Sequence, residues 1–142
     1  MTLEETHQEL SKYLEALDKY KLSKENIECF RMQLYGGKGV SFDSVGKKET
    51  KDNITEIKNQ ALADYETELQ KLMNQVISER KYVLSLINTV SSLAQRKVLA
   101  YLYIQGKSIK EIAQASNYSY KRILQIRNLA LKNISLNFPE FP

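Results

Sequence analysis

Apolar residues recur every three or four positions along most of the chain, which is the spacing of helices that bury one face. Behind Thr2 and Glu5, whose spacing is that of a capping box, this pattern predicts an N-terminal helical arm over residues 1–34. A second stretch predicts a long amphipathic helix over residues 54–90, about 50 Å long if unbroken. Its apolar stripe comprises Ile54, Ile57, Ala61, Tyr65, Leu69, Leu72, Val76, Val83, Leu86 and Ile87.

Residues 35–53 show no apolar periodicity and are rich in glycine, serine and lysine. We interpret them as a flexible polar loop. The run that begins at Gly36 superficially resembles a phosphate-binding loop, but it lacks the required spacing and has no preceding strand. Because a long amphipathic helix cannot bury its stripe by itself, the pattern predicts that the arm folds back into an antiparallel hairpin, that the chain dimerises, or both.

Three shorter helices are predicted over residues 91–134. Ser92, Ser108 and Ser119 each stand where an N-cap is expected, and Gly106 ends the first of these helices. The tail, residues 135–142, contains two prolines and cannot continue a helix. The predicted fold class is therefore all-α: an N-terminal helical hairpin or coiled-coil arm followed by a small helix-turn-helix bundle.

The last two of these helices have the spacing of a helix-turn-helix. Ala113 supplies the small residue where the helices cross, and Asn117 tolerates the positive φ of the tight turn. Tyr118 is expected to fill the hydrophobic position after the turn, with Ile123 and Ile126 fixing the second helix. This geometry would place the start of the helix over residues 119–134 in the major groove of DNA.

The polar face of that helix supplies candidate DNA contacts. Glutamine and asparagine can pair in bidentate fashion with adenine, and lysine with guanine. The predicted base-reading residues are Tyr120, Lys121, Leu124, Gln125 and Asn128. The predicted phosphate contacts are Lys107, Lys110, Ser119, Arg122 and Arg127.

Charge is distributed in a way that favours this interpretation. Residues 91–134 contain eight basic residues and one acidic residue, a net charge of +7, whereas the rest contains 13 basic and 16 acidic residues, a net charge of −3. A basic block on a mildly acidic body suits binding to a phosphate backbone. Because a lysine-rich surface exposed only to solvent would look similar, charge is supporting evidence only.

The sequence contains no recognisable catalytic or metal-binding constellation, so neither an enzymatic activity nor a cofactor is predicted. His7 is expected at the solvated surface, and Cys29, the only cysteine, is expected to be a small buried residue. No stretch is apolar enough to span a membrane, and Glu4 and Glu5 lie where a signal peptide would be basic. We therefore expect a cytoplasmic protein.

The stretch over residues 107–132 resembles the fourth region of primary bacterial sigma factors, which recognises the upstream promoter hexamer. The agreement lies at Glu111-Ile112-Ala113, Ser119, Arg122-Ile123, Gln125-Ile126 and Ala130-Leu131. Two departures from the sigma-factor pattern affect which DNA sequence would be recognised. Lys121 stands where sigma factors usually carry an acidic base reader, and Ser116 replaces a usual leucine, so the recognised sequence cannot be transferred.

The layout of arm, loop, long helix and sigma-like end is also similar to small phage-encoded late transcriptional regulators of the ArpU and RinA kind. This resemblance implies a phage or prophage late-gene activator in a bacterial host, binding double-stranded DNA as a homodimer through the N-terminal and long helices. Contact with RNA polymerase is left open. Two alternatives remain: a DNA-packaging recognition subunit resembling a small terminase, and a protein-interaction module that has lost DNA binding.

Overall fold

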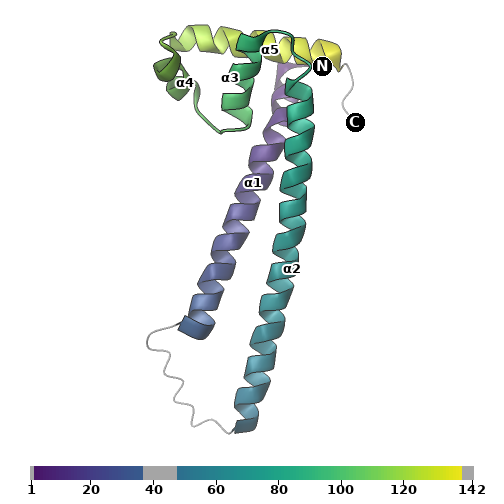
Figure 1. Ribbon diagram of the computed structural model, residues 1–142, viewed down its shortest axis with the longest axis vertical. Coiled ribbons are helices and arrows are strands. Elements are labelled where there is room, and N and C mark those ends of the chain that lie inside the picture. Colours follow the sequence, from purple (N-terminus) through teal and green to yellow (C-terminus); the bar gives the residue numbers. More distant parts are fainter. Residues whose placement is uncertain (1, 37–47, 139–142) are drawn as a thin grey trace. The chain divides into compact units, whose positions relative to one another are not determined.

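The computed structural model describes residues 2–36 and 48–138, and all regular structure in these ranges is helical (Figure 1). The predicted all-α fold class is thus confirmed. The elements are α1 (Leu3–Arg31), the π-helical turn η1 (Met32–Gly36), α2 (Lys48–Ile87), α3 (Leu93–Tyr103), α4 (Ile109–Ser116) and α5 (Tyr120–Asn137). Within the described ranges, none of the helices combines the length and the hydrophobicity needed to cross a bilayer.

The helix boundaries differ from the predicted ones chiefly around the polar loop. α2 begins at Lys48, six residues before the predicted start at Ile54, and it continues as one α-helix to Ile87. Residues 35 and 36 belong to η1. The rest of the predicted loop, residues 37–47, lies outside the described residues, as do tail residues 139–142.

The chain forms two compact units, and each contains a part of α1 and a part of α2. The first unit comprises Met1–Leu17 and Val76–Pro142, and the second comprises Asp18–Gln75. In both units the α1 and α2 segments run antiparallel (Figure 1). The helix-turn-helix therefore belongs to a unit that also includes the start of α1 and the end of α2.

Hydrophobic residues from all five helices form the interior of the first unit. The side chains most completely removed from solvent are Leu10, Val83, Leu99, Ile123, Leu131 and Ile134, together with Val90 from the connection between α2 and α3. The Tyr82 hydroxyl of α2 donates to Glu9 Oε2 of α1 at 3.0 Å. Burial, helped by the Glu9 carboxylate, raises the pKa of Tyr82 to about 12, so the phenol remains the donor at neutral pH.

A second polar contact in this unit joins α1 to α3. His7 Nδ1 lies 2.6 Å from the Tyr103 hydroxyl, and the two rings meet edge to face with centroids 5.4 Å apart. Burial raises the pKa of Tyr103 to about 12, so the neutral phenol can donate to Nδ1. His7 is exposed as expected, but this contact to a buried tyrosine was not foreseen.

Serine caps define the starts of the three C-terminal helices as predicted. The hydroxyl oxygens of Ser92, Ser108 and Ser119 accept the backbone N–H groups of Gln95, Glu111 and Arg122, at 3.4, 3.1 and 3.0 Å. Each bond satisfies a backbone donor that has no partner inside its helix. Ahead of α1, the capping box is also present, because Glu5 N–H donates to Thr2 Oγ1 at 3.1 Å.

The second unit buries much less. Ile27 is the one side chain in its described residues that is classed as buried. The Phe30 and Tyr65 rings pack edge to face at 5.2 Å between centroids, Tyr35 donates to Asn59 Oδ1 at 2.7 Å, and Arg31 pairs with Glu66. Cys29 is exposed, so the prediction of a buried cysteine was wrong: it lines an open groove with Phe30 and Tyr65, in a unit whose described residues bury only one side chain.

Candidate nucleic-acid interface

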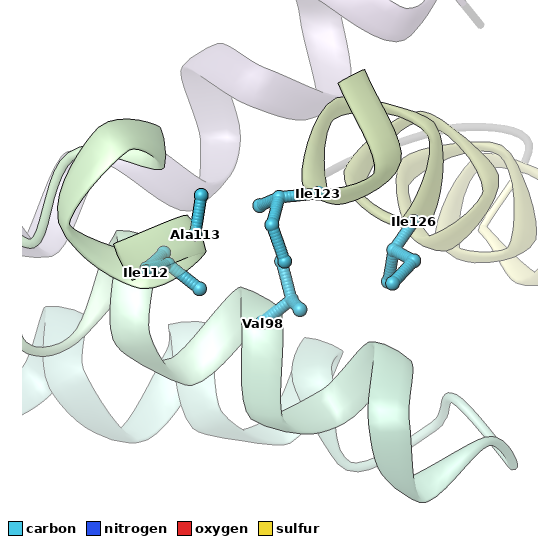
Figure 2. Close-up of a cluster of buried hydrophobic side chains, with 5 residues drawn as sticks. All are labelled: Val98, Ile112, Ala113, Ile123 and Ile126. Carbon is cyan, nitrogen blue, oxygen red and sulfur yellow. The ribbon is translucent and has the colours of Figure 1, made fainter. Parts of the chain in front are cut away.

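A small apolar cluster holds the helix-turn-helix together. Val98 of α3, Ile112 and Ala113 of α4, and Ile123 and Ile126 of α5 are all buried. Figure 2 shows these side chains directed into the space between the three helices. Ala113 lets α5 approach α4 closely, and the two isoleucines fix the rotation of α5 about its axis. The predicted core positions Ala113, Ile123 and Ile126 are thus confirmed.

The turn between α4 and α5 has the expected conformation. Asn117 caps α4 with φ 61° and ψ 17°, the left-handed conformation, and it is the one residue other than glycine with positive φ among those described. Asparagine adopts this conformation more readily than other side chains because its amide can bond locally. Ser119 follows two residues later and starts α5. Only Asn117, Tyr118 and Ser119 thus separate the two helices.

Substitutions at Asn117 should show what this turn contributes to stability. We expect Asn117→Ala to lower the free energy of unfolding by about 1–2 kcal/mol, because alanine has no local hydrogen bond to offset the left-handed strain. Asn117→Gly should stay within about 0.5 kcal/mol of the wild type. Urea unfolding followed by circular dichroism measures both variants. Equal losses would mean that the turn conformation is not the reason for the asparagine.

Tyr118 departs from its predicted role. Its side chain is 55% exposed and does not fill a hydrophobic position after the turn. Tyr118 instead lines an open groove of about 450 Å³ together with Leu93 and Tyr101 of α3, and the core residues Ile112, Ile123 and Ile126 line the same groove. A tyrosine tolerates this position because its hydroxyl can remain hydrated.

The outer face of α5 begins with side chains that a duplex could contact. Tyr120, Lys121, Arg122 and Gln125 are exposed, whereas Ile123 and Ile126 point into the core from the same turns. This division follows from the helical period once the core face is fixed. Leu124, which was predicted to read bases, is only partly exposed.

Arg127 and Asn128 are engaged with each other. Arg127 Nε and Nη2 donate to Asn128 Oδ1 at 3.3 and 3.1 Å, and both residues are half-buried. The Arg127 charge also acts on Tyr103, where it lowers the phenol pKa against the larger effect of burial. The oxygen that Asn128 would offer to adenine is therefore already occupied. Their predicted roles as phosphate and base contacts would require this pair to separate.

The remaining predicted phosphate contacts lie around the start of α4 and of α5. Lys110, in the first turn of α4, is exposed, and Lys107 is exposed with its Nζ 4.9 Å from the centre of the Tyr101 ring. Ser119 is exposed, but its hydroxyl already serves as the cap of α5. The same hydroxyl can still donate its hydrogen to a phosphate oxygen.

An open groove of about 690 Å³ follows the outer face of α5. Its lining includes Arg122, Gln125, Asn128 and Lys132, together with Leu3 from the start of α1. Leu129 also lines it and is exposed, whereas the next residue, Ala130, is fully buried. No sequence signal connected Leu3 to this face, because its proximity depends on how α1 and α5 pack.

Among the residues that the structure describes, no group of three or more histidine, cysteine, aspartate or glutamate side chains is arranged to hold a metal ion. The exposed groups at the candidate site are the cationic, amide and hydroxyl side chains of α5, with Lys107 and Lys110 around the start of α4. Comparison of the chain with protein-family models, with curated proteins and with solved structures found no match.

Proposed function

We propose that this chain binds double-stranded DNA with the α4–turn–α5 motif and places the start of α5 in the major groove. The observation that carries the proposal is the combination of a left-handed Asn117 turn with an exposed Lys121, Arg122 and Gln125 face on the following helix. An α-helix fits the major groove of B-form DNA, and its first turns reach base edges in this class of motif.

Contacts to bases and contacts to phosphates come from different residues of the motif. Lys121 and Gln125 are exposed, four residues apart, and therefore on the same side of the helix, where they would read guanine and adenine edges. Arg122, with Lys107 and Lys110, would contact phosphates and set the position of the helix on the duplex. The net charge of +7 over residues 91–134 would supply affinity for any sequence, since this electrostatic term does not depend on bases.

The biological role within this proposal is regulation of transcription in the cytoplasm of a bacterial host, as an activator of phage or prophage late genes. It is supported by the resemblance of residues 107–132 to the fourth region of sigma factors. RNA polymerase is the protein partner that such an activator would contact.

Substitution of Gln125 tests the proposed base reading. A preferred site is first selected from a random duplex pool with the wild-type chain. Gln125→Ala should then lose about 1–3 kcal/mol of affinity for that site and retain its affinity for random duplex, because a lost bidentate contact affects only the specific complex. Fluorescence anisotropy on both duplexes measures the difference.

Gln8→Ala is the matched control, since Gln8 is also an exposed glutamine on a helix of the same unit, but lies on α1. It should leave both affinities unchanged. Equal losses for Gln125→Ala on selected and random duplex would remove Gln125 from the base-reading residues.

A further inference from the structure

The groove along the outer face of α5 changes from polar to apolar along its length. Near the start of α5 it is lined by Arg122 and Gln125, which are proposed duplex contacts. Further along, where the start of α1 lies beside α5 (Figure 1), it is lined by Leu3, Leu129 and Leu136, which are 43%, 51% and 69% exposed. Single exposed leucines are common, but three that line one groove form a surface suited to a binding partner.

The leucines of α5 lie beyond the reach of the proposed duplex contact. The major groove of B-form DNA is about 8.5 Å deep, and a helix rises about 1.5 Å per residue. With only the start of α5 in the groove, Leu129 lies about 14 Å and Leu136 about 24 Å along the helix from Tyr120. The phosphate backbone offers no apolar group to pack against them. These leucines are therefore suited to a protein and not to DNA.

The charges of the groove indicate the kind of protein. α5 has four basic residues, namely Lys121, Arg122, Arg127 and Lys132, and no acidic residue. Arg122 and Lys132 are exposed and line the groove, and none of the described residues that line it is acidic. Glu4 and Glu5, which follow Leu3 on α1, are not among the lining residues. An acidic partner would meet opposite charges here, whereas a basic partner would meet like charges.

We propose that this groove binds an acidic amphipathic helix of a partner protein, and that the bound helix excludes duplex DNA from α5. From Arg122 to Leu136 the groove follows about 21 Å of α5, which a helix of about four turns would span. Leu129 and Leu136 are seven residues apart, the spacing at which packed helices present successive apolar side chains to each other. Exclusion follows because both complexes would cover Arg122 and Gln125, and this part rests on the proposed function.

Fluorescence anisotropy with two labelled synthetic peptides tests the binding. The acidic probe is a helical peptide of about 16 residues with leucines at heptad spacing and glutamates between them, and the basic probe has lysine at each glutamate. The full-length chain should bind the acidic probe at least about tenfold more tightly than the basic one. The double variant Leu129→Gln and Leu136→Gln should bind the acidic probe at least about tenfold more weakly, because it loses two apolar contacts and keeps every charge.

The double variant Leu22→Gln and Leu93→Gln is the matched control. These leucines are 60% and 59% exposed, on α1 and α3, and they are not among the residues that line the groove. The control should bind the acidic probe as the wild type does. A wild-type chain that binds neither probe, or binds both equally, would overturn the proposal. So would a control variant that binds as weakly as the groove variant.

Displacement of a labelled duplex by the unlabelled acidic probe tests the exclusion. The probe should release the duplex from the wild type. The groove variant, which keeps Arg122 and Gln125, should hold the duplex with wild-type affinity and release it only at about tenfold higher probe concentration. A duplex that stays bound at saturating probe would overturn the exclusion, and a groove variant that also loses duplex affinity would assign the leucines to DNA and overturn the proposal. Probe binding by a chain without affinity for duplex would support the protein-binding groove and contradict only the proposed DNA binding.

Discussion

Replacement of Leu99 by alanine should lower the free energy of unfolding by about 2–5 kcal/mol. Leu99 lies on α3 and is fully buried in the interior of the first unit. Its removal would leave a cavity that the surrounding helices can fill only in part, so the cost includes lost contacts as well as lost hydrophobic transfer. Urea unfolding of the full-length chain, followed by circular dichroism and tyrosine fluorescence, measures the change.

Leu136→Ala provides the control for this substitution. Leu136 lies near the end of α5 and is exposed, so the same change should alter stability by no more than about 0.5 kcal/mol. A loss for Leu99→Ala as small as that for Leu136→Ala would show that α3 is not packed as described.

Reversal of two charges, in the double variant Lys110→Glu and Arg122→Glu, should weaken binding to duplex DNA by at least roughly a hundredfold at moderate salt. Two phosphate contacts would be replaced by repulsion. The slope of log affinity against log salt concentration should also become shallower by about 2, since each phosphate contact contributes about 0.9. Fluorescence anisotropy over a series of salt concentrations gives both quantities.

The control for charge reversal is the double variant Lys19→Glu and Lys24→Glu. These lysines are exposed on the arm, and their reversal changes the net charge by the same amount. If the arm variant weakened binding and flattened the slope as much as the α4–α5 variant, binding would depend on total charge and not on the proposed face.

Local patterns were sufficient to predict the helix-turn-helix. The serine caps, the left-handed Asn117 and the buried Ala113, Ile123 and Ile126 each follow from short-range rules of capping, turn conformation and helical period. These features lie within a few residues of one another in sequence, so a single stretch contains the information that defines them.

Contacts between distant parts of the chain were not predictable in the same way. The pairing of His7 with Tyr103 and the placement of Leu3 beside α5 depend on how α1 packs within the first unit. Hydrophobic period shows that a face is buried, but it does not show which helix covers it. Cys29 was wrongly predicted to be buried because the pattern does not show how far a neighbouring helix covers it.

Within the candidate site, helical period predicted which side chains face solvent. It did not predict which of them already have a hydrogen-bond partner in the protein. Gln125 and Lys121 are exposed as expected. Arg127 and Asn128 are neighbours in sequence, and nothing in the pattern indicated that the guanidinium would bond to the amide oxygen. Such pairing depends on rotamers and on local burial, which a one-dimensional pattern does not specify.

The most direct test of the central claim is the salt dependence of duplex binding by the full-length chain. With Lys107, Lys110 and Arg122 on phosphates, the slope of log affinity against log salt concentration should be about −3 or steeper, starting from clear binding at low ionic strength. A chain that is folded by circular dichroism yet shows no affinity for any duplex at low ionic strength would contradict the account.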